Sequence, residues 1–271
     1  MTRKSLIEII KKKRSLLCVG LDTDINKIPE FLKQDFDNPV LEFNKRIIKA
    51  TADLAVAFKI NTAFYESQGE EGWKNLISTI DLIPEDTFII ADAKRADIGN
   101  TSRMYAKAFF EKMNADAITV APYMGSDSVE PFFDYENKWI ILLALTSNTG
   151  SKDFQYLTID EKGTKLFEQV LKTSSSWGNI NNTMYVVGAT HPEDFKSIRK
   201  IIPDHFILVP GIGAQGGDLE QVLKNGLNSD YGLLINSSRG IIFASADKNF
   251  DSVAREKALE LTNKIRKTVK F

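Results

Sequence analysis

The stretch Phe88-Ile89-Ile90-Ala91-Asp92-Ala93-Lys94 runs from a continuous apolar segment directly into a carboxylate and an ammonium. A short run of this apolar character is typical of a strand that is covered on both faces, as in a parallel sheet. Side chains two apart on a strand point to the same face, so Asp92 and Lys94 are expected to be buried together beside Ile90. Buried opposite charges need partners, and such a pair at a strand end is more often functional when it faces a cleft.

Seven further apolar runs resemble this one, and each is followed by a segment with helical periodicity, a pattern that predicts βα units around a parallel sheet. The eight predicted strands are Leu16–Asp22, Val56–Asn61, Phe88–Lys94, Ala117–Pro122, Trp139–Ser147, Met184–Thr190, Phe206–Ile212 and Gly232–Arg239. The predicted helices are Met1–Arg14, Leu41–Asp53, Gly72–Leu82, Ile98–Asn114, Gly163–Lys172, Glu193–Ile201, Leu219–Gly226 and Ser252–Val269. The polar stretch Thr173–Thr183 is expected to be a surface loop.

Eight such units favour a single (β/α)8 TIM barrel domain over residues 1–271, because no linker rich in proline, glycine or serine divides the chain. The alternative is a doubly wound open sheet. That fold places its glycine-rich phosphate loop after the first strand, whereas the glycine-rich segment Gly211–Gly217 follows the seventh.

The composition limits which partners, which cell compartment and which acid–base groups the chain is expected to use. The 35 basic and 36 acidic residues give a net charge of -1, which argues against nucleic acid as the main partner. The longest apolar runs are too short for a membrane span, and the single cysteine is typical of a reducing compartment, so we expect a cytoplasmic protein. With only His191 and His205, acid–base chemistry is expected to fall to carboxylates, lysines or tyrosines. We interpret His191 as a turn residue and place His205 at the rim opposite the site.

In a TIM barrel the carboxyl ends of the strands share one site, and the predicted strands here end in polar residues. Asp22 ends the first strand, Lys59 lies on the second, and Ser147 ends the fifth. A structural ion pair at the rim is the plain interpretation of Asp92 and Lys94. The second cation, Lys59, favours a functional cluster instead.

The segment Pro210–Asp218 and the arginine Arg239 follow the seventh and eighth predicted strands. These two loops commonly build a phosphate site in TIM barrels, and an arginine adds a bidentate contact. The sequence therefore predicts phosphate recognition rather than a plain connecting loop. The role of Asp97 cannot be assigned from spacing alone, because its position before Ile98-Gly99-Asn100-Thr101 suits a helix cap and a catalytic role equally well.

Several motifs together resemble the orotidine 5′-phosphate decarboxylase family, in particular its longer bacterial type. They are Gly20-Leu21-Asp22, Phe58-Lys59-Ile60-Asn61-Thr62-Ala63-Phe64-Tyr65-Glu66, Asp92-Ala93-Lys94-Arg95-Ala96-Asp97-Ile98-Gly99-Asn100-Thr101, Ala121-Pro122-Tyr123-Met124-Gly125, Thr146-Ser147-Asn148, Pro210-Gly211-Ile212-Gly213-Ala214-Gln215-Gly216-Gly217-Asp218 and Ser238-Arg239. The resemblance implies decarboxylation of orotidine 5′-phosphate (OMP) to uridine 5′-phosphate (UMP), the last step of UMP synthesis, without cofactor or metal.

The resemblance also implies residue roles. Lys59, Asp92, Lys94 and Asp97 would form an alternating charge network, in which Lys94 protonates C6 of the pyrimidine and Asp92 lies against the scissile carboxylate. Asp97 and Thr101 would reach the neighbouring site of a homodimer. The residues implied to bind substrate are Asp22 and Lys59 at the ribose, Ser147 at the pyrimidine, Gln215 and Arg239 at the phosphate, and Pro210.

Three positions depart from the family pattern: Ala96 replaces an expected glycine, Ala121 an asparagine and Thr149 a proline. None of these changes removes a charge, so they bear on loop geometry rather than reaction class.

Three alternative functions stay open. The chain could be a metal-dependent sugar-phosphate decarboxylase or synthase, a Schiff-base aldolase that uses Lys59 or Lys94, or a noncatalytic binder of phosphoribosyl ligands. A lysine paired with carboxylates stays protonated, which argues against the aldolase.

Overall fold

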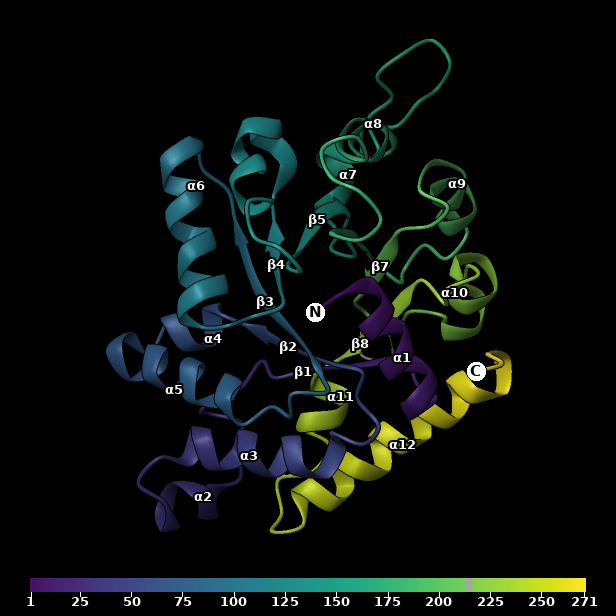
Figure 1. Cartoon of the computed structure of the whole chain (residues 1–271). Coiled ribbons are helices and arrows are strands. Elements are labelled where there is room, and N and C mark those ends of the chain that lie inside the picture. The colour runs from purple at the N-terminus through teal and green to yellow at the C-terminus, as the bar shows by residue number, and fades with distance from the viewer. Residues whose placement is uncertain (213–215) are drawn as a thin grey trace.

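A closed barrel organises the chain, as the computed structural model of residues 1–212 and 216–271 shows (Figure 1). Within those residues the strands are parallel and pair in chain order, and β8 returns to β1 through the partners Leu17 and Ile235. The strands are β1 (Leu17–Gly20), β2 (Ala57–Asn61), β3 (Phe88–Arg95), β4 (Ala117–Val120), β5 (Trp139–Leu145), β6 (Thr183–Val187), β7 (Phe206–Val209) and β8 (Leu233–Ser237). The predicted TIM barrel is therefore confirmed, and most of the predicted strands extend too far.

Helices surround the barrel. They are α1 (Arg3–Lys13), α2 (Glu30–Asp35), α3 (Pro39–Thr51), α4 (Ala63–Glu66), α5 (Gly69–Asp81), α6 (Gly99–Ala106), α7 (Ser151–Phe154), α8 (Leu166–Ser174), α9 (Asp194–Ile201), α10 (Leu219–Gly226), α11 (Arg239–Ile242) and α12 (Phe250–Thr268). A π-helical turn, Lys107–Lys112, continues α6, so the single α-helix predicted over Ile98–Asn114 changes its hydrogen-bond pattern midway. The short helices α2, α4, α7 and α11 were not predicted, because helices of four to six residues are too short to show a periodic pattern.

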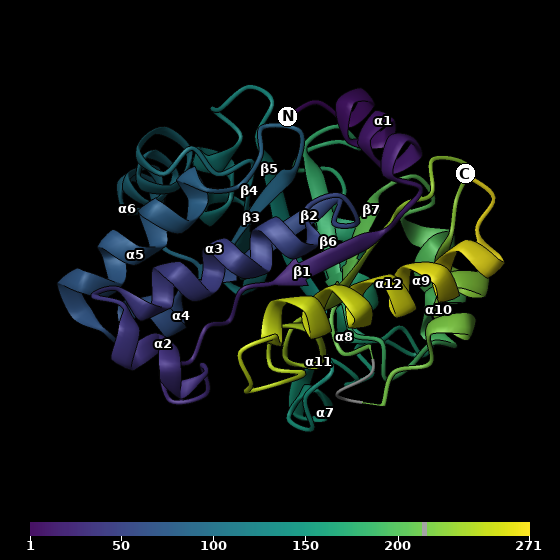
Figure 2. The ribbon, with the colours of Figure 1, turned by 90° about the horizontal axis from the view of Figure 1, so that it is seen from below.

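The helices α3 and α12 lie side by side outside β1, although one is near the start of the chain and the other at its end (Figures 1 and 2). Asn38 caps α3 by accepting a hydrogen bond from the Leu41 N–H, and Pro39 occupies the first turn. The ring of Phe43 stacks on Phe250 with centroids 5.0 Å apart. This packing fixes the last helix against the first part of the barrel.

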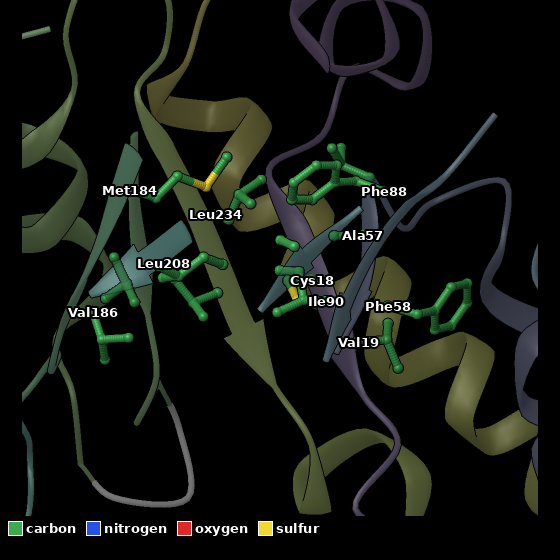
Figure 3. Close-up of a cluster of buried hydrophobic side chains, with 14 of the residues drawn as sticks. Cys18, Val19, Ala57, Phe58, Phe88, Ile90, Met184, Val186, Leu208 and Leu234 are labelled. Atoms are coloured by element: carbon green, nitrogen blue, oxygen red, sulfur yellow. The ribbon is translucent and has the colours of Figure 1, made fainter. Parts of the chain in front are cut away.

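Side chains alternate between the two faces of each strand and fill the barrel interior (Figure 3). Leu208 and Val186 point inward among the neighbouring strands, whereas Val19 and Phe58 point outward toward the helix layer. All four side chains are buried. Because both faces of the sheet are covered, the strands have the continuous apolar character from which they were predicted.

The amino end of the barrel is closed. Trp139 makes edge-to-face contacts with Phe88 and Phe206, and the Arg3 guanidinium of α1 lies 5.0 Å from the Phe206 ring centroid. Figure 2 shows α1 at this end and α7 and α11 at the other. His205 precedes β7 at the closed end, as expected from the sequence. This aromatic packing fills the amino end of the barrel among the described residues. No helix in the described ranges is both long enough and apolar enough to span a membrane.

Candidate active site

A cavity of about 310 Å³ opens at the carboxyl ends of the strands. It brings together seven of the residues predicted to form the site: Asp22, Lys59, Asp92, Lys94, Ser147, Pro210 and Arg239. Leu143, Val186 and Leu208 add an apolar wall. A larger groove, of about 710 Å³, lies outside the barrel against α10, α11 and α12. We place the site in the smaller cavity, because buried charges from several strands converge there.

Four charged side chains form a chain of ion pairs along the cavity. The Nζ atom of Lys59 lies 3.1 Å from Oδ1 of Asp22 and 2.8 Å from Oδ2 of Asp92. The other carboxylate oxygen of Asp92 lies 2.6 Å from Nζ of Lys94. The order of charges is therefore Asp22, Lys59, Asp92, Lys94, with each sign next to its opposite.

Burial and pairing act in opposite directions on the central groups. Burial alone would lower the pKa of Lys59, but the carboxylates of Asp92 and Asp22 raise it above its ordinary value. Burial alone would raise the pKa of Asp92, but the ammonium groups of Lys59 and Lys94 hold it below its ordinary value. Both side chains are therefore charged at neutral pH. A protonated Lys59 is a poor nucleophile, which disfavours Schiff-base chemistry at this position.

Lys94 lies differently from what the sequence predicts. Its side chain is 49% exposed, against 10% for Asp92, so only the aspartate is buried as expected. The strand is irregular here: the register between β3 and β4 shifts between Ala91 and Arg95, and Lys94 has a φ of 48°. Regular alternation, on which the prediction of a shared buried face rests, ends at this point. The left-handed residue places the lysine at the mouth of the cavity with its Nζ turned back to Asp92.

Arg95 anchors the end of the same strand from the outside. Its guanidinium pairs with Glu66 and lies over the rings of Tyr105 and Phe109, at 5.4 and 5.6 Å from their centroids. These contacts bind β3 to the helix layer. Arg95 is therefore a structural element of the motif, and it does not line the cavity.

Thr119 on β4 was not identified from the sequence. Its hydroxyl donates to Oδ1 of Asp92 at 3.0 Å and accepts a hydrogen bond from the Lys94 backbone N–H at 2.9 Å. The available signal was a single hydroxyl in a buried strand next to the strand that carries Asp92, since a buried hydroxyl needs a polar partner.

Two glycines let the strand-end residues approach the cavity. A Cβ at Gly188 would lie 2.7 Å from the backbone nitrogen and Cβ of Ser147, and a Cβ at Gly20 would lie 2.7 Å from Cβ of Ser238. Ser238 immediately precedes Arg239, the first residue of α11. Both glycines are therefore required by close packing beneath residues that line the cavity.

Asn236 of β8 presents an amide to the same cavity. The residue is buried, and its Oδ1 has no hydrogen-bond partner among the residues that the structure describes. An unsatisfied buried amide is costly unless a ligand or solvent molecule completes it. Asn236 lies within the predicted strand Gly232–Arg239, but the sequence did not indicate that its side chain faces the site.

Asp97 and Thr101 do not line the cavity of their own chain. The Asp97 carboxylate accepts a hydrogen bond from the Ile98 N–H at 2.8 Å, and Ile98 rather than Asp97 is the cap residue of α6. The capping interpretation of Asp97 is therefore wrong.

Gln215 lies outside the described residues. Ala96 has no positive φ, so the backbone there does not require the glycine that the family pattern predicts.

The carboxylates of the cavity are already engaged by ammonium groups, so a divalent ion would have to displace Lys59 or Lys94 from Asp92. In the described ranges, His191, Glu193 and Asp194 do place ligand atoms close enough for a metal ion. This group starts α9, and none of its members lines the cavity. The fold and the cavity define a (β/α)8-barrel protein that holds paired lysines and aspartates at the carboxyl ends of its strands.

Comparison with known proteins agrees with this class. The family model described as orotidine 5′-phosphate decarboxylase / HUMPS family matches residues 15–250. The orotidine 5′-phosphate decarboxylase of Bacteroides fragilis strain YCH46 is 58% identical over 273 residues, which cover 100% of this chain and 99% of that protein. The corresponding protein of Flavobacterium johnsoniae is 59% identical over 264 residues, or 96% of each chain.

Two solved structures from Leishmania donovani are also similar. Its OMP decarboxylase superposes with a TM-score of 0.81 at 38% identity, covering 98% of this chain and 99% of that one. Its UMP synthase superposes with a TM-score of 0.83 at 40% identity, and this chain spans 97% of its own length but only 56% of the synthase. The chain belongs to the orotidine 5′-phosphate decarboxylase family and is a carboxy-lyase.

Proposed function

We propose that this chain converts OMP to UMP and carbon dioxide, the last step of pyrimidine nucleotide synthesis, and that Lys94 delivers the proton that replaces the carboxylate. One observation carries the mechanism: a chain of alternating charges ends in a lysine at the cavity mouth, with Nζ 2.6 Å from the buried Asp92. The proposal is supported by the similar proteins of Bacteroides fragilis and Flavobacterium johnsoniae, which are named orotidine 5′-phosphate decarboxylase.

The chemistry requires stabilisation of a carbanion. When the bond between C6 and the carboxylate breaks, its electron pair remains at C6, where no neighbouring carbonyl or cofactor delocalises it. A fixed ammonium beside C6 stabilises this charge because it is oriented before the reaction begins. Lys94 then transfers one proton to C6, carbon dioxide leaves, and the neutral amine recovers its proton from solvent.

Asp92 contributes in two ways. It holds the Lys94 ammonium, and its depressed pKa keeps it negative. A negative carboxylate beside the substrate carboxylate is repulsive before reaction, and the repulsion disappears as neutral carbon dioxide departs. Lys59 on the other side of Asp92 limits the cost of burying that charge.

The remaining residues would bind the nucleotide. Asp22 and Lys59 are proposed to contact the ribose hydroxyls, and Ser147 the amide edge of the pyrimidine. Pro210 and Arg239 line the cavity where β7 and β8 end, which suits a phosphate group. Gln215, which lies outside the described residues, is proposed to bind the phosphate. Binding energy from the phosphate can then hold the unfavourable pair of carboxylates together.

We also propose a homodimer in which Asp97 and Thr101 complete the neighbouring site. Three apolar side chains are exposed: Ile98 at 59% and Met104 at 51%, which are close to these two residues in the chain, and Tyr123 at 95%, in the turn that follows β4. Exposed apolar groups of this kind suit an interface. A second copy of the chain would cover them and bring Asp97 to the Lys94 side of the partner. The cytoplasmic location expected from the sequence stays a prediction.

The test is direct. Loss of the ultraviolet absorbance of OMP on addition of purified protein measures turnover, with heat-denatured protein as the control. We expect rapid loss of substrate and formation of an equal amount of UMP. Tight binding of UMP without any turnover of OMP would contradict catalysis and support the noncatalytic binder instead.

A further inference from the structure

A single threonine connects the two residues at the centre of the proposed mechanism. Thr119 lies on the inner face of β4 and is 1% exposed. Its hydroxyl donates to Oδ1 of Asp92, 3.0 Å away, and accepts from the backbone N–H of Lys94, 2.9 Å away. The hydroxyl therefore uses its one proton on the carboxylate and a lone pair on the lysine backbone.

The second of these bonds compensates for an irregularity in the sheet. Between Ala91 and Arg95 the register of β3 against β4 shifts, so the Lys94 N–H falls outside the regular pairing. Lys94 also has a φ of 48°, a region that residues other than glycine occupy only when their surroundings fix them. Thr119 supplies the acceptor that this N–H would otherwise lack.

The first bond fixes the carboxylate. Oδ1 of Asp92 receives both the Thr119 hydroxyl and the Lys94 ammonium, at 3.0 and 2.6 Å, while Oδ2 receives Lys59. With three donors on its two oxygens, the Asp92 carboxylate has one preferred orientation. The position of Lys94 Nζ is thus fixed from both ends: by its backbone and by the oxygen to which it binds.

We propose that Thr119 is a positioning residue for catalysis, which holds Lys94 and Asp92 in the geometry needed for proton delivery to C6. This inference rests on the proposed function. Thr119 contacts no substrate in this scheme, because it does not line the cavity. Its effect is transmitted through the two groups that do.

The experiment compares Thr119→Val, which keeps the shape but removes the hydroxyl, with Thr119→Ser, which keeps the hydroxyl. For Thr119→Val we expect kcat to fall by about 10- to 100-fold, the scale of misplacing a reacting group by a fraction of an ångström to an ångström. KM for OMP should change by less than about threefold, because the groups proposed to bind ribose and phosphate are untouched. Thr119→Ser should recover most of the lost kcat.

Two outcomes would overturn the inference. One is a Thr119→Val enzyme with the kcat of the unmodified chain. The other is equal impairment of the Val and Ser variants, which would indicate packing of the γ-methyl group rather than the hydroxyl. Thermal unfolding of all three proteins shows whether lost activity is lost folding. A destabilised Val variant whose specific activity per folded molecule is unchanged is an instance of the first outcome.

A second readout does not depend on turnover. In Thr119→Val the Lys94 amide loses its acceptor, so its hydrogen exchange should be faster than in the unmodified chain, and Thr119→Ser should restore protection. Unchanged exchange would contradict the positioning role. If the unmodified chain shows no turnover of OMP but the exchange result holds, the proposed function fails while the structural link between Thr119 and Lys94 stands.

Discussion

Nζ of Lys94 lies 2.6 Å from Oδ1 of Asp92, yet the lysine side chain is half exposed and the aspartate is buried. The pair therefore spans the boundary between the barrel interior and the cavity mouth. One partner is held rigidly by the core, and the other can meet a ligand without leaving its counterion. This arrangement suits a proton donor that must be charged before substrate binds and fixed when it reacts.

Removal of the Lys94 ammonium should abolish most of the activity. We expect Lys94→Ala to lower kcat by at least about a thousandfold, the scale of deleting one preorganised charge that stabilises a transition state. Absorbance at a single OMP concentration well above KM measures the effect. Lys49→Ala is the matched control, because Lys49 is an exposed lysine on α3. Turnover of Lys94→Ala equal to that of Lys49→Ala would contradict the mechanism.

Mixed dimers test whether Asp97 serves the neighbouring site. Asp97→Ala and Lys94→Ala proteins should each be inactive alone. Mixed in equal amounts with free exchange, half of the dimers are hybrids with one intact site in two, so about a quarter of the normal activity should return. Lys94→Ala mixed with Asp92→Ala is the control and should stay inactive, because those two groups belong to one chain's network. No recovery despite demonstrated exchange of subunits would argue against a shared site.

Chelation separates this mechanism from that of metal-dependent relatives of the same barrel. Lys59 and Lys94 already neutralise Asp92, so we expect turnover to be unchanged after dialysis against EDTA and unchanged again when Mg²⁺ is restored. Activity that disappears with EDTA and returns with Mg²⁺ would show that an ion, rather than an ammonium, stabilises the reaction.

His205 should make the protein less stable in mild acid. Burial, with Arg3 and Arg199 nearby, lowers the pKa of His205 from 6.5 to about 4. Between these values the unfolded chain binds a proton that the folded chain rejects, so the free energy of unfolding should fall as pH drops from 6.5 to 4, by up to about 3 kcal/mol. Urea unfolding across this range measures the slope.

His205→Phe isolates that contribution, because the phenyl ring keeps the edge-to-face contact with Tyr185 and cannot titrate. Neither ring nitrogen of His205 has a hydrogen-bond partner among the described residues, so the substitution breaks no described bond. The difference in unfolding free energy between the two proteins should change with pH between 4 and 6.5 and be constant at higher pH. Parallel curves over the acid range would disprove the assignment.

The barrel could be predicted because its strands are buried on both faces and its strand ends are polar. Lys59 and Asp92 meet as expected, since β2 and β3 are neighbours with Asn61 opposite Asp92. The pairing of Asp22 with Lys59 was not predicted; it depends on the register that places Gly20 opposite Lys59. Register between strands is a property of tertiary packing that a single strand does not encode.

The exposure of the Lys94 side chain could not be predicted from the sequence either. Period-two alternation predicts a buried lysine, and only the shifted register and the left-handed backbone at that residue overrule it. Thr119 was not identified for a related reason. Its hydroxyl forms hydrogen bonds with residues about 25 positions earlier in the chain, and these contacts depend on the pairing of β3 with β4.

Closure of the barrel between β8 and β1 has a consequence for synthesis. Cys18 and Asn236, from the first and last strands, pair directly, and the Ser238 hydroxyl donates to the Gly20 carbonyl oxygen. During translation β1 leaves the ribosome long before β8 has been synthesised. Until then the edge of β1 that pairs with β8 has no hydrogen-bond partners. The nascent chain should therefore depend on protection of that edge, and truncation before residue 233 should leave an aggregation-prone intermediate rather than a weaker enzyme.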